Sequence, residues 1–202
     1  MLWLAAATFA KWLGAPISVS LGITEVAMSR IVIFGNSGSG KSTLAAALAR
    51  EAGLEHLDMD TLAWDKASPT QRRSLIESRN ELSCFIQAHN EWVIEGCYSD
   101  LLSLAISHCD KLIFLNPGIE ACIRNCRSRP WEPHKYPSLE AQNQNLEMLI
   151  RWVREYETRD DEFSLRRHRQ LFAKFDGEKV EYTDNIEMPN KAMHPTHEHA
   201  RG

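Results

Sequence analysis

The chain has 202 residues, of which 44% are hydrophobic and 25% are charged, as in an average globular protein. This length is sufficient for one domain with a core of ordinary size. The formal net charge of -4 and the pI near 6.1 exclude broad electrostatic capture of nucleic acid or anionic lipid, because both need a concentrated cationic surface. We therefore expect no direct nucleic-acid partner and no membrane partner.

The five cysteines and the two ends of the chain bear on location and domain boundaries. The cysteines are scattered, without a Cys-x-x-Cys pair, which is typical of reduced thiols in a cytoplasmic protein. Residues 1–27 include an apolar stretch that is too short to span a bilayer, and Met28, a candidate start, precedes an apolar run. We interpret 1–27 as an N-terminal extension, 28–186 as the domain and 187–202 as a disordered tail.

In chain order, short apolar runs alternate with helical patterns, as expected of a parallel sheet built from βαβ units. The five predicted strands are residues 30–34, 54–57, 92–94, 111–115 and 179–182. The predicted helices are residues 41–52, 69–89, 99–107, 119–127, 140–156 and 164–175. We predict an α/β fold of three layers with a five-stranded parallel sheet, and a small lid around residues 124–138, where a proline-rich loop follows a helix.

The strongest functional signal is the stretch GNSGSGKS at residues 35–42, which satisfies the pattern G-x-x-x-x-G-K-[ST]. It lies between an apolar strand and an alanine-rich helix, where a phosphate-binding loop (P-loop) must lie. Glycines allow the loop to turn its amide groups toward phosphate oxygens at a helix N-terminus. The expected nucleotide-binding residues are Gly35, Asn36, Ser37, Gly38, Ser39, Gly40, Lys41, Ser42 and Thr43.

Three side chains of this loop have expected roles of their own. Lys41 should reach the β- and γ-phosphates, and the Ser42 hydroxyl should coordinate Mg²⁺ that bridges the same phosphates. Thr43 should support the α-phosphate or cap the helix. The motif thus predicts ATP and Mg²⁺ as cofactors.

Acidic residues follow the second and third predicted strands, at the edge of the sheet where ligands bind in open α/β folds. Asp58 and Asp60 are spaced by one residue; one could hold Mg²⁺ through water while the other orients the acceptor hydroxyl or acts as general base. The alternative is that one of them caps the helix or turn that starts at Thr61. Glu95 ends an apolar strand before Gly96 and is a second candidate base, although it could instead cap a helix or pair with Lys41.

Arginines and one asparagine complete the candidate site. Arg124, Arg127 and Arg129 precede the proline-rich loop, and phosphoryl transfer needs such cations because charge spreads over the transferring oxygens. Arg154 and Arg159 are further candidates. The fourth strand is followed by Asn116, where many P-loop ATPases carry an acid, which favours a kinase over a motor-type ATPase.

Residues 30–185 resemble the adenylate-kinase and shikimate-kinase branch of P-loop kinases, including relatives described as DNA topology modulation proteins. The likeness is carried by GNSGSGKST at 35–43, HLDMDTLAW at 56–64, WVIEGCY at 92–98, the arginine-bearing segment 124–129 and RWVREYETR at 151–159. The resemblance to shikimate kinases implies Asp58 near Mg²⁺ and Asp60 near the acceptor hydroxyl. Glu95-Gly96-Cys97 replaces their glycine triplet, so the resemblance does not imply shikimate as acceptor, and no signature of a nucleoside-monophosphate pocket is evident.

These features lead to one hypothesis and one alternative. The hypothesis is a cytoplasmic P-loop kinase that transfers the γ-phosphoryl group of Mg·ATP to a small-molecule or nucleotide acceptor. Its predicted catalytic residues are Lys41, Asp60, Glu95, Arg124, Arg127 and Arg129, and its predicted metal-binding residues are Ser42 and Asp58. The alternative is a nucleotide-dependent switch or regulatory ATPase that has no small-molecule acceptor and influences DNA topology indirectly.

Overall fold

Five parallel strands form the centre of the molecule. In the computed structural model, which describes residues 29–65, 71–133 and 136–186, they are β1 (Arg30–Gly35), β2 (Glu55–Asp58), β3 (Trp92–Gly96), β4 (Lys111–Leu115) and β5 (Glu178–Tyr182). Their order in the sheet is β2-β3-β1-β4-β5, and every neighbouring pair is parallel. The predicted five-stranded parallel sheet is confirmed. The predicted extension 1–27 and tail 187–202 lie outside the described residues.

The central strand β1 is buried on both faces, as its unbroken apolar run predicts. Ile31 and Ile33 pack with side chains of α2 (Lys41–Ala52). Val32 and Phe34 pack in the opposite cluster, which includes side chains of α4 (Leu75–Ala88) and α5 (Ser99–Ile106). Because successive side chains of a strand point to opposite faces, this one strand anchors two hydrophobic cores and produces the predicted three layers.

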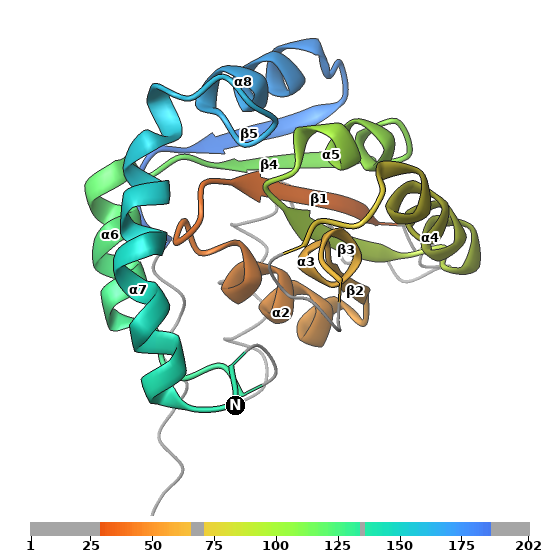
Figure 1. Ribbon diagram of the computed structural model, residues 1–202. Helices are drawn as coiled ribbons and strands as arrows, with labels where there is room; N and C mark the ends of the chain where they lie inside the picture. The colour runs from red at the N-terminus through yellow and green to blue at the C-terminus, as the bar shows by residue number, and fades with distance from the viewer. Residues whose placement is uncertain (1–28, 66–70, 134–135, 187–202) are drawn as a thin grey trace, which may run out of the picture.

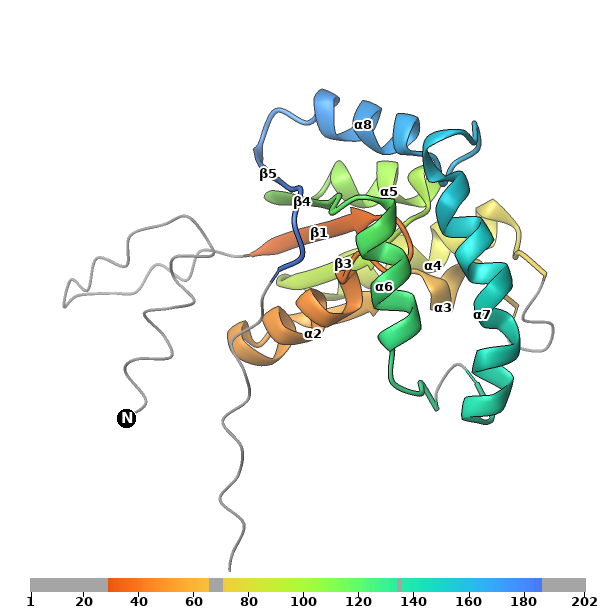
Figure 2. The same ribbon diagram turned by 90° about the vertical axis from the view of Figure 1, so that its left-hand side faces the viewer.

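The remaining helices are α3 (Asp60–Ala63), α6 (Ile119–Ser128), α7 (Leu139–Arg154), the 3₁₀ helix η1 (Glu155–Glu157) and α8 (Leu165–Lys174). In Figure 1 the arrow of β1 points toward α6 and α7, which lie side by side at that end of the sheet in Figures 1 and 2. Buried side chains of both helices form a third core cluster. The carboxyl ends of the strands therefore meet a paired-helix arm.

Two helix predictions needed correction. The helix expected from residue 69 begins at Leu75, because Ser74 is extended and its hydroxyl accepts the Glu77 amide hydrogen as an N-cap. The short helix α3 directly after β2 was not predicted as an element. Among the parts of the chain that the structure describes, no helix combines the length and the apolar character needed to cross a membrane.

Candidate active site

The predicted P-loop connects β1 to α2 at the carboxyl edge of the sheet. The amide of Ser39 donates to the Asn36 carbonyl at 3.2 Å, and Gly40, with φ of 95°, is the residue at which the chain enters the helix. The Lys41 ammonium donates to the same Asn36 carbonyl at 2.9 Å. The loop thus presents a helix N-terminus and a cation together, which is the combination that attracts phosphate.

The loop is braced from both sides by α6 and α7. Gly38 has φ of 78°, and a Cβ atom there would lie 2.4 Å from the Cys122 carbonyl oxygen and 2.6 Å from the Cys126 sulfur. The Asn125 amide donates to the Gly38 carbonyl at 2.7 Å. On the other side, the buried Asn36 amide donates to the Val153 carbonyl at 3.0 Å. Only glycine fits at position 38, both for its backbone angle and for the closeness of α6.

A cavity of about 410 Å³ lies beside the loop and has the size of a small-molecule site. It is bounded by residues 38–44, by Leu115, by the end of α6 and the segment after it, and by Asn185 and Ile186. Sequence reasoning had not singled out Asn125, Asn185 or Glu132. Nothing local in the sequence marks them, because they meet the P-loop only through the tertiary fold.

The three predicted arginines do not converge. Arg129 is half-buried, lines the cavity and pairs with Glu132 at 3.1 Å. Arg124 and Arg127 are exposed on α6 and do not line that cavity.

The other two arginine candidates lie at the end of α7 and just after η1. Arg154 is exposed at the end of α7. The Arg159 guanidinium stacks 3.4 Å from the centre of the Trp152 ring and pairs with Glu155 and Asp161. Arg159 is therefore packed against Trp152 and does not extend into solvent.

Glu95 is a predicted acid that interacts with Lys41 and Ser42 of the P-loop. It pairs in register with Asp58 of β2 on one side and Ile33 of β1 on the other, and its side chain is 2% exposed. Ser42 and Lys41 both act to lower the pKa of this carboxylate, and His56 Nε2 lies 3.9 Å from Glu95 Oε1. Oε1 is buried without a hydrogen-bond partner in the structure.

The environment of Glu95 favours its protonated form. Burial is the main cause that raises its pKa, to about 7, and the negative charge of Asp58 adds to the effect, whereas Lys41 opposes it. A carboxylate that is buried at this cost beside Lys41 and Ser42 is characteristic of a functional site.

Asp58 and Asp60 differ in surroundings although only one residue separates them. Asp58 accepts the Asp60 amide hydrogen at 2.9 Å, so it caps the turn into α3, the role that was the alternative in the sequence interpretation. Asp60 accepts the Tyr98 hydroxyl hydrogen at 2.6 Å, and the same hydroxyl oxygen accepts the Trp64 indole hydrogen at 2.6 Å.

Asn116 lies away from this cluster of acids. Its side-chain amide donates to Glu181 of β5 at 2.9 Å, and its backbone amide donates to the Tyr182 carbonyl. The acid beside the P-loop serine is supplied by β3 instead, because β3 is the neighbour of β1 on the opposite side from β4.

The oxygen atoms around Ser42 suit a hard cation. Mg²⁺ prefers one or two carboxylates together with phosphate oxygens and water, and here the Ser42 hydroxyl and the buried Glu95 carboxylate meet, with Asp58 in register beside them. Within the described residues, no group of three or more His, Cys, Asp and Glu side chains could hold a metal ion. This donor set fits an ion that arrives with a nucleotide.

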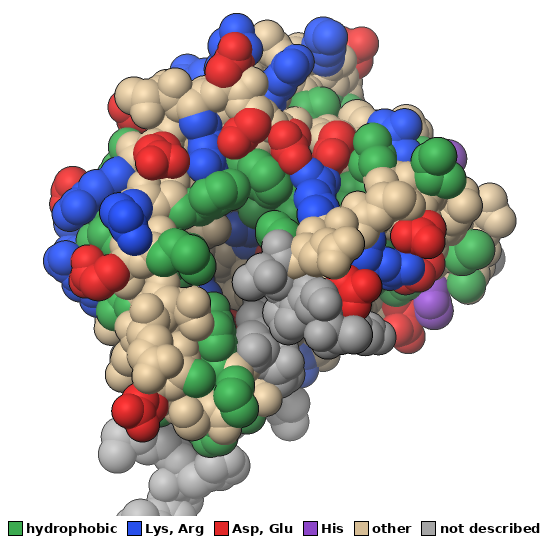
Figure 3. Space-filling model, in the orientation of Figure 1, with side chains coloured by type: hydrophobic (Ala, Val, Ile, Leu, Met, Phe, Trp, Pro, Cys, Tyr) green, Lys and Arg blue, Asp and Glu red, His purple; other side chains and the backbone are tan. Residues whose placement is uncertain are grey.

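The surface view shows how one face of the molecule is shaped. In the orientation of Figure 1, the molecule is hollowed near its centre, and acidic side chains gather along the upper rim of the hollow (Figure 3). The hollow lies between the arm of α6 and α7 and the side of the molecule that carries α3 and α4 (Figures 1 and 3).

Comparison with known proteins decides the family. A family model described as ABC transporter matches residues 19–171. The chain belongs to this family of P-loop nucleotide-binding proteins. The match spans the P-loop, the acids Asp58, Asp60 and Glu95, and both helices of the arm, so nucleotide binding is the property that fold, motif and family share.

One curated relative and several solved structures are similar to parts of the chain. The uncharacterized protein YqaC of Bacillus subtilis (strain 168) is 35% identical over 86 residues, 42% of this chain. The match spans about half of that relative, 47% of its length.

Among solved structures, a shikimate kinase from Bacteroides thetaiotaomicron has a TM-score of 0.42 and 21% identity, covering 64% of this chain and 80% of that one. A gluconokinase from Sinorhizobium meliloti 1021 has a TM-score of 0.43 and 18% identity, covering 76% and 82%. A deoxyadenosine kinase from M. mycoides has a TM-score of 0.43 and 13% identity, covering 78% and 92%. These likenesses are too remote to say what this chain does.

Proposed function

We propose that this protein is a phosphotransferase that binds Mg·ATP at residues 35–43 and transfers its γ-phosphoryl group to a small hydroxyl- or phosphate-bearing acceptor. Within the P-loop proteins, we assign it by its motifs to the adenylate-kinase and shikimate-kinase branch, near the DNA topology modulation proteins. The five free thiols support a reducing compartment such as the cytoplasm.

The observation that carries the proposal is the placement of two differently held acids at one edge of the sheet. Glu95 contacts the P-loop serine, whereas Asp60 is held on the far side of Asp58 by Tyr98. Nucleotide binding alone needs only the first acid. A second, fixed carboxylate beside it is what a phosphoryl acceptor requires, because its hydroxyl must be oriented and must lose a proton.

Each group of residues in the candidate site has its own proposed role. Lys41 and the loop amides hold the β- and γ-phosphates, and Arg129 reaches the nucleotide from the segment that we propose as a lid around 124–138. Ser42 and Glu95, with Asp58 beside them, would hold Mg²⁺, which when bound supplies charge neutralisation at the phosphates. Asp60 orients the acceptor hydroxyl and accepts its proton.

The test is ATP consumption by the purified full-length chain with Mg²⁺, in the presence of nucleoside monophosphates, nucleosides, polyols and sugar acids in turn. We expect ADP release that depends on one class of acceptor and that is lost in Lys41→Ala. Lys174→Ala, which changes an exposed lysine of α8, is the matched control. Tight ATP binding without acceptor-stimulated turnover would instead favour the nucleotide switch.

A further inference from the structure

We propose that Tyr98 is a positioning residue: its hydroxyl fixes the Asp60 carboxylate toward the acceptor, and the Trp64 indole in turn fixes the hydroxyl. The inference rests on the proposed function for the role of Asp60, but it does not depend on which acceptor is used. It concerns a side chain that touches neither the P-loop nor the cavity beside it.

The direction of each hydrogen bond follows from the chemistry of the three groups. An indole N–H can only donate, and a tyrosine hydroxyl has a single hydrogen. Because Trp64 Nε1 donates to the Tyr98 oxygen at 2.6 Å, the hydroxyl hydrogen is left for Asp60 Oδ1, also at 2.6 Å. The chain of donation therefore runs one way, from Trp64 through Tyr98 to Asp60, and ends on a carboxylate oxygen.

The ring of Tyr98 cannot turn away from this arrangement. Its side chain is 2% exposed, and Phe163 meets it edge-on at 5.2 Å between ring centres. The Arg72 guanidinium lies 5.2 Å from the ring centre. Burial raises the pKa of the Tyr98 hydroxyl, so the group remains a donor throughout the physiological range.

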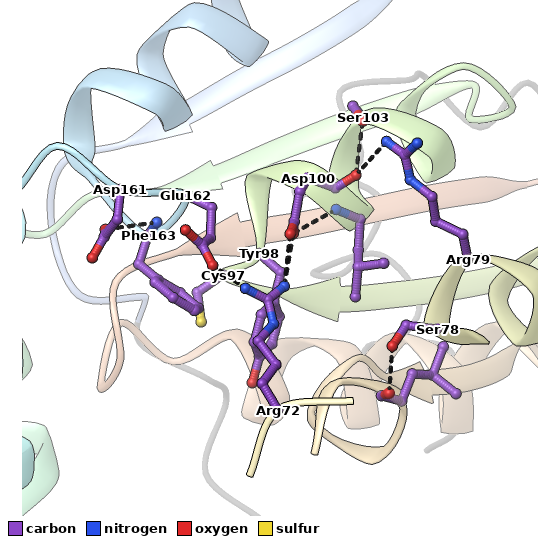
Figure 4. A network of polar contacts seen from close by, with 12 residues as sticks. Arg72, Ser78, Arg79, Cys97, Tyr98, Asp100, Ser103, Asp161, Glu162 and Phe163 are labelled. Carbon is purple, nitrogen blue, oxygen red and sulfur yellow. Dashed lines mark hydrogen bonds and ion pairs between the residues drawn. The ribbon is translucent and has the colours of Figure 1, made fainter. Parts of the chain in front are cut away.

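Arg72 is itself held by two acids from different parts of the chain. Its guanidinium forms two hydrogen bonds to Asp100, at 3.0 and 2.8 Å, and a further ion pair to Glu162. Figure 4 shows Arg72 reaching between these two carboxylates, with Tyr98 and Phe163 nearby. The Ser99 amide also donates to the Glu162 carbonyl. Thus the start of α5, the segment before α4 and the segment after η1 all hold the tyrosine in place.

Such rigidity matters for a group that must meet an acceptor. A displacement of about 1 Å in a reacting group can cost on the order of a hundredfold in rate. Asp60 is at the first position of a helix of four residues, which offers little rigidity of its own. The Asp60 amide is fixed by Asp58, and Tyr98 supplies the constraint on the carboxylate.

The decisive variant is Tyr98→Phe in the full-length protein, which keeps the ring and removes only the hydroxyl. We expect kcat for Mg·ATP turnover to fall by about tenfold or more, with the KM for Mg·ATP unchanged, since loss of a hydrogen bond to a charged group costs about that much. Tyr156→Phe is the matched control: Tyr156 is equally buried, and its hydroxyl donates to His168 at 2.6 Å. Equal losses of kcat in both variants, or an unchanged kcat in Tyr98→Phe, would overturn the proposal.

A second measurement needs no turnover and separates this inference from the proposed function. The indole N–H signal of Trp64, assigned in ¹⁵N NMR spectra with Trp64→Phe, reports on its bond to Tyr98. We expect Asp60→Ala to shift that signal and to speed its exchange with solvent, because the hydroxyl then loses its acceptor and turns. If the signal is unchanged, Tyr98 does not hold Asp60. If the signal responds while wild-type protein turns over no acceptor, the positioning stands and the kinase proposal fails.

Discussion

Glu95 is the residue whose environment conflicts most with its charge. Its carboxylate is buried beside Asp58, and its pKa is raised to about 7. The folded protein therefore keeps a proton on Glu95 that the unfolded chain releases near pH 4.5, so this residue lowers stability progressively as the pH rises from about 4.5 to 7. A position that costs stability and contacts the P-loop serine is expected to be retained for function.

For Glu95→Gln we predict opposite effects on stability and activity. At pH 8, without Mg²⁺ or nucleotide, the free energy of unfolding should rise, by at most about 3 kcal/mol, because glutamine cannot ionise. Turnover of Mg·ATP should fall by about a hundredfold, since the carboxylate is lost from the side of Ser42. Urea unfolding and an ADP-release assay measure the two effects. Glu91→Gln, directly before β3, is the control. A variant of Glu95 that is both less stable and fully active would contradict this assignment.

Two glycines with similar backbone angles should respond differently to alanine. Gly38 has φ of 78° and a Cβ there would strike α6, whereas Gly53 has φ of 72° and nothing within 4 Å of the added Cβ. Gly53→Ala should cost about 1 kcal/mol from backbone strain and leave nucleotide binding intact. Gly38→Ala should cost more and abolish binding of a fluorescent ATP analogue. Retained binding in Gly38→Ala would show that the closeness of the loop to α6 is not needed.

At the scale of single residues, the sequence indicated which residue types form the candidate site better than it indicated which of these residues contact one another. The P-loop pattern and the acids after two strands could be read directly, because both depend on local spacing. The contact of Ser42 with Glu95, and that of Asp60 with Tyr98, join residues that are 53 and 38 positions apart. They follow from the strand order, which no local pattern encodes.

Among the elements, the arm of α6 and α7 determines which arginine can act. Arg129 lies just past the end of α6 and lines the cavity beside the P-loop, whereas Arg124 is exposed on the helix. We predict that Arg129→Ala raises the KM for ATP by about tenfold, the loss expected for one charged contact to phosphate. Arg124→Ala should leave it within about twofold of wild type. Steady-state kinetics test this, and a larger effect from Arg124 would revive the original three-arginine prediction.

The packing of α8 introduces a second pH dependence, which comes from a buried histidine rather than from Glu95. His168 is fully buried; its Nε2–H donates to the Cys97 carbonyl at 2.9 Å, and its Nδ1 accepts from Tyr156. Burial is the main cause that lowers its pKa to about 4, the Cys97 carbonyl opposes the shift, and Lys41 adds to it. The neutral ring therefore joins α8 and η1 to the turn after β3.

Stability should fall with acidity in a defined window because of this histidine. The unfolded chain takes up a proton near pH 6.5 and the folded chain only near pH 4, so the loss accumulates between these values and reaches about 3 kcal/mol at most. In His168→Gln that pH-dependent loss should shrink, although the variant should be less stable at pH 7. Urea denaturation at several pH values measures it, with exposed His108→Gln as control. An unchanged pH profile in His168→Gln would rule out this origin.

Most helices and strands could be predicted from the sequence, and the reason differs from one element to another. The helix at 41–52 agrees with α2 because a run of alanines and leucines ends at Gly53, which has the left-handed conformation of a helix terminus. The helix at 69–89 was drawn too long because its polar N-terminal part shows no clear period, and only the capping of Ser74 marks the true start. The four-residue α3 is too short to show any period.

For the whole molecule, nucleotide should act as a stabilising ligand, because the P-loop couples β1, α2, α6 and α7. At a Mg·ATP concentration a hundredfold above Kd, the gain is about 2.7 kcal/mol, which corresponds to a rise in Tm of about 5 to 10 °C for a chain of this size. Differential scanning fluorimetry measures this rise. It should vanish in Lys41→Ala and persist in Lys174→Ala; an equal rise in both variants would mean that the ligand binds elsewhere.

The position of β1 at the centre of the sheet also has a consequence for synthesis on the ribosome. Its partners are β3 and β4, at residues 92–96 and 111–115, so the apolar run Ile31–Phe34 does not have a neighbour on both sides until about 80 more residues have been made. At about 5 to 20 residues per second, that delay lasts roughly 4 to 16 seconds. Throughout it the strand that later carries the P-loop is exposed, which makes the nascent chain a candidate for chaperone binding before it can bind any nucleotide.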